Sequence, residues 1–168
     1  MLDSLDKSSH QVFFTTYHFH SSKLKLLIAV IFAILVFFIS DFFMGLATLS
    51  YSMLIIGLLN RFRSKHEHAF FMTLGISIDL IIVLSLEIQR NAIGTAVSFS
   101  LSSLQQAHIG FSSLATLLYF PVLFLGVRNL KSPPTLVSLK AHKILGYSAF
   151  IFRSLGFVLM FSLIGLKK

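Results

Sequence analysis

Two residues of opposite charge lie inside long apolar segments of the sequence. Asp79 follows His68 by eleven residues, and Arg153 follows His142 by the same eleven residues. Eleven residues make about three turns of helix, so each histidine shares a helix face with a charge about 16 Å further along. An unpaired charge in a membrane interior costs at least about 3 kcal/mol. We therefore predict an ion pair between Asp79 and Arg153 near the middle of a membrane.

The same spacing occurs in a segment that should run in the opposite direction. His108 begins this segment, and Tyr119 follows it by eleven residues. Tyr119 should reach the depth of Asp79 and Arg153 and form a hydrogen bond to one of them. These three residues form a predicted intramembrane polar centre. Such a centre either fixes the register of the helices or takes part in proton, ion or ligand chemistry.

The histidines at the start of two apolar segments suggest a haem b site. A b haem needs two imidazoles at the same depth on facing helices, and His68 and His142 match in depth. Because the haem propionates are anionic, cations should lie beside such a site. The predicted cofactor-binding cations are Arg61, Arg63, Lys140 and Lys143.

Small residues behind these histidines would leave space for a flat macrocycle. Gly75 follows His68 on its expected helix face, and Gly146 and Ala149 follow His142. The alternative is that the histidines are ordinary membrane-boundary residues and that the small residues serve helix packing. His66 competes with His68 as a ligand, but it faces another way on any helix.

A second polar cluster is predicted at the opposite ends of the apolar segments. Glu87 and Arg90 end one segment, and His108 begins the next. Glu87 and His108 could form a protonatable carboxylate–imidazole pair beside a quinone pocket. They could equally be ordinary interfacial residues, because two or three ligands without a fixed spacing make a poor metal site.

The composition indicates what positions these residues. Hydrophobic residues make up 55% of the 168 residues and charged residues only 12%, and there is no cysteine. This composition is typical of membrane-spanning helices. The net charge of +8 comes from basic residues that flank the apolar segments, which is the pattern of a membrane protein and does not indicate nucleic-acid binding. We predict an all-α, polytopic integral membrane helical bundle in the lipid bilayer.

Five spans are expected, with the last four forming the core. The first apolar stretch, residues 24–60, is too long for one straight helix across about 30 Å of hydrocarbon, so we predict a hairpin with a turn at Ser40-Asp41. One tilted helix with an interfacial extension is the alternative. The predicted spans are 24–40, 42–60, 69–88, 108–127 and 143–165. Residues 1–22 form a polar arm, residues 23–168 the bundle, and residues 91–106 should run along the outer surface.

The distribution of basic residues predicts the topology. The N-terminal arm and the loops at 61–68 and 128–143 hold most of the lysines and arginines. Because cytoplasmic loops carry an excess of these residues, we place the N-terminus in the cytoplasm. The expected location is the bacterial inner membrane, and the mitochondrial inner membrane fits the same pattern.

At "HEHAFFM", at His108 and at "AHKILGY", the chain resembles small bacterial membrane proteins that carry histidines at the ends of a four-helix bundle. They include an uncharacterised family associated with haem–copper oxidase maturation and, more distantly, the b-type cytochromes. The resemblance covers roughly residues 45–165, and His68 with Met72 matches a His-x-x-x-Met at the start of a span. Where that family tends to place a further histidine, this chain has Glu87 and Arg90.

The first function hypothesis is a b-type-cytochrome-like protein, with haem b bound by His68 and His142 and a part in electron transfer or in the function of a respiratory oxidase; the resemblance is consistent with it. A cofactor-free accessory or assembly subunit of a larger membrane complex is the second hypothesis. Short loops and a large apolar surface favour this second hypothesis. Its expected partners are other membrane subunits. A small transporter is less consistent with the sequence, because paired broken helices are not evident.

Overall fold

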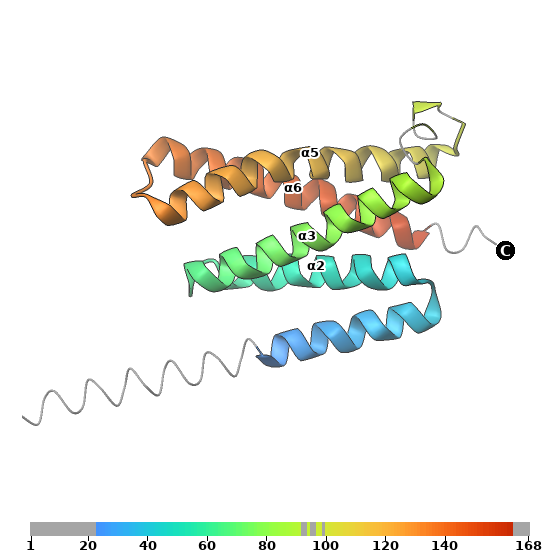
Figure 1. The fold of residues 1–168 in the computed structure, drawn as a ribbon, viewed down its shortest axis with the longest axis horizontal. Coiled ribbons are helices and arrows are strands. Elements are labelled where there is room, and N and C mark those ends of the chain that lie inside the picture. Colours follow the sequence, from blue (N-terminus) through green and yellow to red (C-terminus); the bar gives the residue numbers. More distant parts are fainter. Residues whose placement is uncertain (1–22, 92–93, 95–96, 99, 163–168) are drawn as a thin grey trace, which may run out of the picture.

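The computed structural model describes residues 23–91, 94, 97–98 and 100–162, and these residues form an all-α helical membrane bundle (Figure 1). A helix at residues 23–39 precedes the four long helices. These are α2 (Phe42–Asn60), α3 (Lys65–Arg90), α5 (Ser103–Lys131) and α6 (Leu136–Ser162). Each of the four is long and apolar enough to cross a membrane. The predicted arm at residues 1–22 lies outside the described residues.

The first apolar stretch forms the predicted hairpin. The helix at residues 23–39 ends before Asp41, whose carboxylate caps α2 by accepting a hydrogen bond from the Met44 backbone N–H at 2.9 Å. An aspartate at this position satisfies a free N–H group of the first turn. The chain then returns, because Lys25 Nζ donates to Asn60 Oδ1 at 3.3 Å. The alternative of one tilted helix is therefore wrong.

Three helices begin at earlier residues than we predicted from the apolar segments of the sequence. α3 starts at Lys65, α5 at Ser103 and α6 at Leu136, which is four, five and seven residues before the predicted starts. Serine caps explain two of these starts, because Ser64 and Ser102 accept hydrogen bonds from backbone N–H groups of the first turn. Hydropathy marks the hydrocarbon region, whereas capping residues mark where a helix begins. The first residues of α5 therefore replace part of the predicted surface segment.

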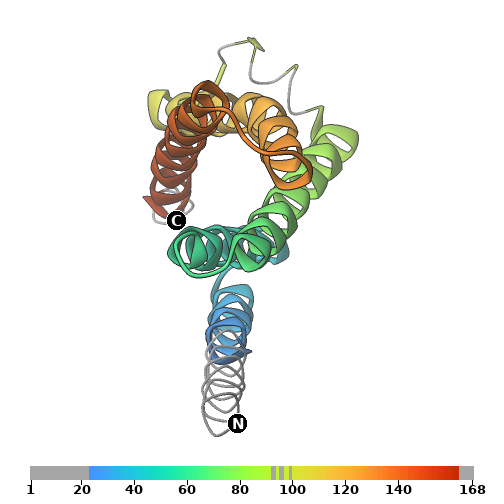
Figure 2. The ribbon, with the colours of Figure 1, turned by 90° about the vertical axis from the view of Figure 1, so that its left-hand side faces the viewer.

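The four spans pack as two antiparallel hairpins. α2 packs mainly on α3, and α5 packs mainly on α6, while α3 with α5 and α2 with α6 make fewer contacts. Viewed along the bundle, the order around the ring is α2, α3, α5, α6, so that α3 faces α6 across the centre (Figure 2). The turn between α2 and α3 and the turn between α5 and α6 lie at the same end of the bundle (Figure 1). We call this end the inner end and the opposite end the outer end.

A small apolar core joins the two hairpins. Each of the four spans contributes to it, through Leu54, Ile76, Ala115, Tyr119 and Ala149, all of which are buried. Most large apolar side chains instead point outward, and such a surface requires a lipid environment rather than water. Because lipid removes the hydrophobic drive for helix association, close packing and polar contacts must hold the hairpins together.

Gly75 supplies the close packing between α2 and α3. A Cβ atom at Gly75 would lie 2.9 Å from Leu54 Cδ2 and 3.0 Å from the Ser50 backbone oxygen. We therefore expect Gly75→Ala to force the helices apart and to lower the free energy of unfolding by about 1–3 kcal/mol, as overpacking does. Unfolding in mixed detergent micelles, followed by circular dichroism, measures this change.

Gly146 on α6 provides the matched control. A Cβ atom at Gly146 would meet nothing within 4 Å. Gly146→Ala should therefore leave stability unchanged or raise it by up to about 1 kcal/mol, because alanine favours a helix over glycine. Equal effects of the two substitutions would contradict the packing assigned to Gly75.

Candidate functional site

The predicted polar centre is present at the middle of the bundle. Arg153 donates from Nε to Asp79 Oδ2 and from Nη2 to Asp79 Oδ1, both at 2.7 Å. The Tyr119 hydroxyl donates to Asp79 Oδ2, also at 2.7 Å. Asp79 is 6% exposed and Arg153 7%. The planar guanidinium fits the carboxylate in the two-pronged geometry that gives the strongest hydrogen bonds between charged groups.

This triad joins the two hairpins. Asp79 comes from α3, whereas Tyr119 and Arg153 come from α5 and α6. The equal spacing from His68 and His142 brings the charges to one depth, because α3 and α6 both run from the inner to the outer end. The contact among the three residues is confirmed, and what it does remains a prediction.

A fourth polar contact between the hairpins involves Tyr51 of α2, which the sequence analysis did not identify. Its hydroxyl donates to Ser154 Oγ at 2.9 Å. Its ring stacks on Phe157, with centroids 4.3 Å apart, and on Phe150, with centroids 5.9 Å apart. A single tyrosine in an apolar span carries no sequence signal of its own, so this contact could be found only from the packing of α2 on α6.

The two parts of the Tyr51 contact can be separated by substitution. We expect Tyr51→Phe to remove only the hydroxyl bond and to cost about 0.5–1.5 kcal/mol of stability. Tyr51→Leu also removes the stacking on Phe150 and Phe157 and should cost about 0.5–1.5 kcal/mol more. Unfolding of both variants in mixed micelles measures the difference. A Tyr51→Phe variant as unstable as Tyr51→Leu would show that the hydroxyl, and not the ring, carries the contact.

At the inner end, His68 lies against the preceding helix of its own hairpin. Its Nδ1 is 2.8 Å from the Gly57 backbone oxygen. A carbonyl can only accept, so Nδ1 carries the proton and Nε2 keeps its lone pair. α2 and α3 approach closely at Gly57, because a Cβ atom there would lie 2.8 Å from the side chain of Met72 and 3.1 Å from its backbone nitrogen. His66, two residues earlier, is exposed.

His142 occupies the corresponding position in the second hairpin. Its ring lies against Gly126 of α5, where a Cβ atom would be 3.3 Å from His142 Cε1. Its Nδ1 is buried and has no hydrogen-bond partner among the described residues. His68 and His142 both lie near the start of their helices, at the inner end of the bundle. The two predicted ligands are thus at the same end of helices that face each other across the bundle.

The space expected around a macrocycle is only partly present. Gly75 does not leave room beside His68, because it packs against α2. The prediction of space at Gly75 was therefore wrong, because Leu54 and Ser50 of α2 already occupy the space beside this glycine. Ala149 is buried in the apolar core. At Gly146, a Cβ atom would meet nothing within 4 Å, so this position is not filled by a neighbouring side chain.

The predicted cations lie at the same end as the two histidines. Arg61 donates to the Tyr147 hydroxyl of α6, and its guanidinium lies 5.1 Å from the centre of the Tyr147 ring. Arg61 therefore links α2 to α6 at the inner end. The other three, Arg63, Lys140 and Lys143, have exposed side chains. Their role in holding propionates stays a prediction.

At the outer end, the structure describes the contacts of one member of the predicted cluster, His108. His108 Nδ1 is 2.8 Å from the Gly156 backbone oxygen, so the imidazole is anchored to α6. The proposed pairing of Glu87 with His108 stays a prediction, and the Arg90 side chain lies outside the described part of the chain. Ser112, one turn beyond His108 on α5, also faces Gly156; a Cβ atom at Gly156 would be 2.6 Å from Ser112 Oγ.

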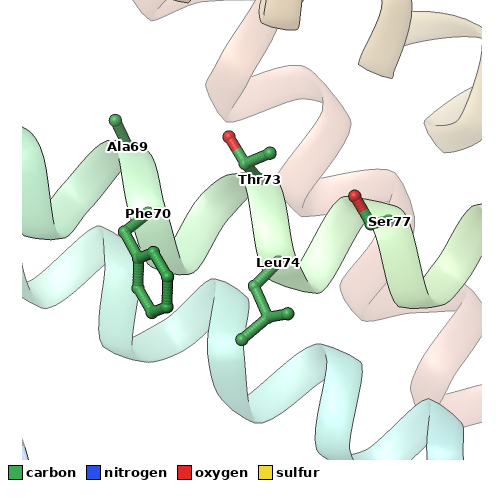
Figure 3. A pocket seen from close by; sticks show the side chains of 5 residues that line it. All are labelled: Ala69, Phe70, Thr73, Leu74 and Ser77. Carbon is green, nitrogen blue, oxygen red and sulfur yellow. The ribbon is translucent and has the colours of Figure 1, made fainter.

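A shallow pocket of about 410 Å³ lies on α3, away from the predicted ligands. Ala69, Phe70, Thr73, Leu74 and Ser77 line it (Figure 3). All five belong to one helix, and none carries an imidazole or a charge. This pocket is therefore no candidate for the haem site.

Within the described residues, there is no group of three or more histidine, cysteine, aspartate or glutamate side chains that could hold a metal ion. A haem held by two imidazoles needs no such group. Comparison of the chain with protein-family models, with curated proteins and with solved structures found no significant match.

Proposed function

We propose that the protein is a b-type-cytochrome-like membrane protein that takes part in electron transfer or in the function of a respiratory oxidase. The observation that carries this proposal is that His68 and His142 lie at the same end of two helices that face each other across the bundle. A second feature supports it: the bond from His68 Nδ1 to Gly57 leaves Nε2 available. Histidines that bind metals commonly donate their other N–H to a backbone carbonyl, which fixes the tautomer and the ring.

The residues present fit a haem b in their donor chemistry. His68 and His142 would be the axial ligands, and Arg61 is the best placed of the four cations to hold a propionate, because it already lies across the inner end from α2 to α6. The buried, unpaired Nδ1 of His142 is a polar atom that requires a partner. When bound, haem supplies reversible one-electron chemistry. Arg63, Lys140 and Lys143 would add positive charge at the same end.

The triad would keep this site in register. Asp79 and Arg153 lie three turns beyond His68 and His142, so their bond holds α3 and α6 at matched depth. The histidines would then keep matching heights without a direct contact. A quinone and other membrane subunits are the expected electron-transfer partners, and the bacterial inner membrane, with the N-terminus in the cytoplasm, is the expected location.

A visible spectrum of the purified protein tests the proposal. The protein is produced with haem supplied to the cells and purified in mild detergent, and a dithionite-reduced minus oxidised spectrum is recorded. We expect a sharp b-type α-band at close to one haem per chain. A featureless spectrum from folded protein would contradict the proposal.

One observation favours a second function, that of a cofactor-free accessory subunit. Ala69, Thr73 and Ser77 follow one another on a face of α3, and Thr73 and Ser77 are exposed (Figure 3). Small residues at this spacing let another helix approach closely in a membrane. If this face holds a partner, Thr73→Leu should prevent co-purification of other membrane subunits, while the exposed Leu84→Ala, further along α3, should not.

A further inference from the structure

The outer half of the bundle contains a column of polar groups on α5 and α6. His108 lies at the outer end of α5 and contacts the Gly156 carbonyl of α6. Ser112 follows one turn deeper and lies against the same glycine. Arg153 precedes Gly156 by about one turn on α6. A polar group therefore occurs at every turn between the outer end and the triad.

Ser112 is the member of this column whose side chain lacks a hydrogen-bond partner. Its Oγ is buried and has no hydrogen-bond partner among the described residues. A buried hydroxyl without a partner costs about 1–3 kcal/mol, so such groups are rare in folded proteins. His108 offers an acceptor beside it, because its Nδ1–H donates to Gly156 and its Nε2 keeps a lone pair. Water can bond to both groups at once, since it donates and accepts.

The inner half of the bundle is different. Between the triad and the two inner histidines, the interior is filled by apolar side chains, among them Leu54, Ile76 and Ala149. Ile76 and Leu54 are each only 1% exposed. A polar column that leads inward from the outer end thus stops at the triad, where an apolar layer begins.

We propose that water enters the bundle from the outer end along His108 and Ser112 and reaches the triad of Asp79, Tyr119 and Arg153. The path would hold water molecules, and protons could move along them. His108 Nε2 and Ser112 Oγ supply alternating acceptor and donor groups, and the Asp79 carboxylate lies at the end. Glu87 of α3 lies at the same end of the bundle and adds a carboxylate near the entrance. This path is independent of the proposed haem, which lies beyond the apolar layer.

The absence of cysteine from the sequence allows a direct test of the path. Single cysteines are placed at Ser112 and, as matched controls, at Leu114 and Leu117, which lie on the lipid-facing side of α5 at neighbouring depths and are 45% and 65% exposed. A charged, membrane-impermeant methanethiosulfonate is applied separately to each side of membranes that contain the full-length protein. The reagent requires a thiolate, which forms in water and is disfavoured in apolar surroundings.

We expect Ser112→Cys to react from one side only, the side of the outer end. Its rate should exceed that of Leu114→Cys and Leu117→Cys by at least about tenfold, which corresponds to one unit of thiol pKa. His108→Cys, one turn nearer the entrance, should react faster still, and it replaces Ser112→Cys if that variant does not fold. Rates for Ser112→Cys and His108→Cys no higher than those of the lipid-facing controls would overturn the proposal. Reaction only from the inner end would also overturn it.

Discussion

Arg153→Met is expected to destabilise the bundle strongly. The change removes both hydrogen bonds from the guanidinium and leaves the Asp79 carboxylate buried with only the Tyr119 hydroxyl as partner. Removing one partner of a buried ion pair costs about 3–5 kcal/mol, because the remaining charge is uncompensated. The free energy of unfolding in mixed detergent micelles measures the loss.

The double substitution separates the charge from the packing. Asp79→Leu combined with Arg153→Met replaces the pair by apolar side chains, and stability should recover to within about 1–2 kcal/mol of the native protein, since apolar replacements of buried pairs are often neutral. Tyr119→Phe removes one hydrogen bond but no charge, so we expect a loss of only about 0.5–1.5 kcal/mol. If the effects of Asp79→Leu and Arg153→Met simply add, the two residues are not coupled and the assignment fails.

The depth of a residue along a membrane helix could be predicted from the sequence. Each of the pairs His68 with Asp79, His142 with Arg153 and His108 with Tyr119 is separated by eleven residues, and the helical rise turns this count directly into a depth. An unpaired charge in the membrane interior is costly, so two opposite charges at the same depth are expected to pair. The matching depths of Asp79 and Arg153 therefore predicted their contact. The turn beside Asp41 was also predictable, because the apolar stretch exceeded the thickness of the hydrocarbon.

The direction in which a residue faces could not be predicted in the same way. Apolar side chains surround each span, so the sequence does not distinguish a face toward lipid from a face toward another helix. Gly75 was expected beside a macrocycle, yet it packs against Ser50 and Leu54 of α2. Tyr51 lies between Ser50 and Ser52 in the sequence, but these neighbours do not indicate its partner, because its contact with Ser154 depends on how α2 approaches α6.

The two hairpins also share a feature that comparison of their sequences does not reveal. In each, a histidine of the second helix lies against a glycine of the first: His68 against Gly57, and His142 against Gly126. In each, a charge follows eleven residues later. The hairpin turns differ in length, so the equivalence appears only when the helices are placed in space. This repetition places the two imidazoles at equivalent positions on facing helices.

His68→Ala and His142→Ala are each expected to abolish the b-type absorbance of the protein. Either change removes one of the two proposed ligands, and no other histidine of the described residues is expected to replace it, because His66 is exposed and His108 lies at the outer end. The reduced minus oxidised spectrum of each purified variant, with the haem content per chain, measures the loss. Neither substitution touches the triad, so stability without haem should fall by only about 0.5–1.5 kcal/mol in His68→Ala, which loses the bond to Gly57.

His66→Ala is the matched control, since it removes a histidine two residues away on the same helix. Its spectrum should equal that of the native protein. Gly126→Ala supplies a graded test, because its Cβ atom would lie 3.3 Å from His142 Cε1 and would press on the ring without removing a ligand. We expect haem to remain bound there with a shifted α-band or reduction potential, as a reoriented ligand would give. Absorbance that survives in both His68→Ala and His142→Ala would place the haem elsewhere, whereas loss in His66→Ala alone would assign the ligand on α3 to His66.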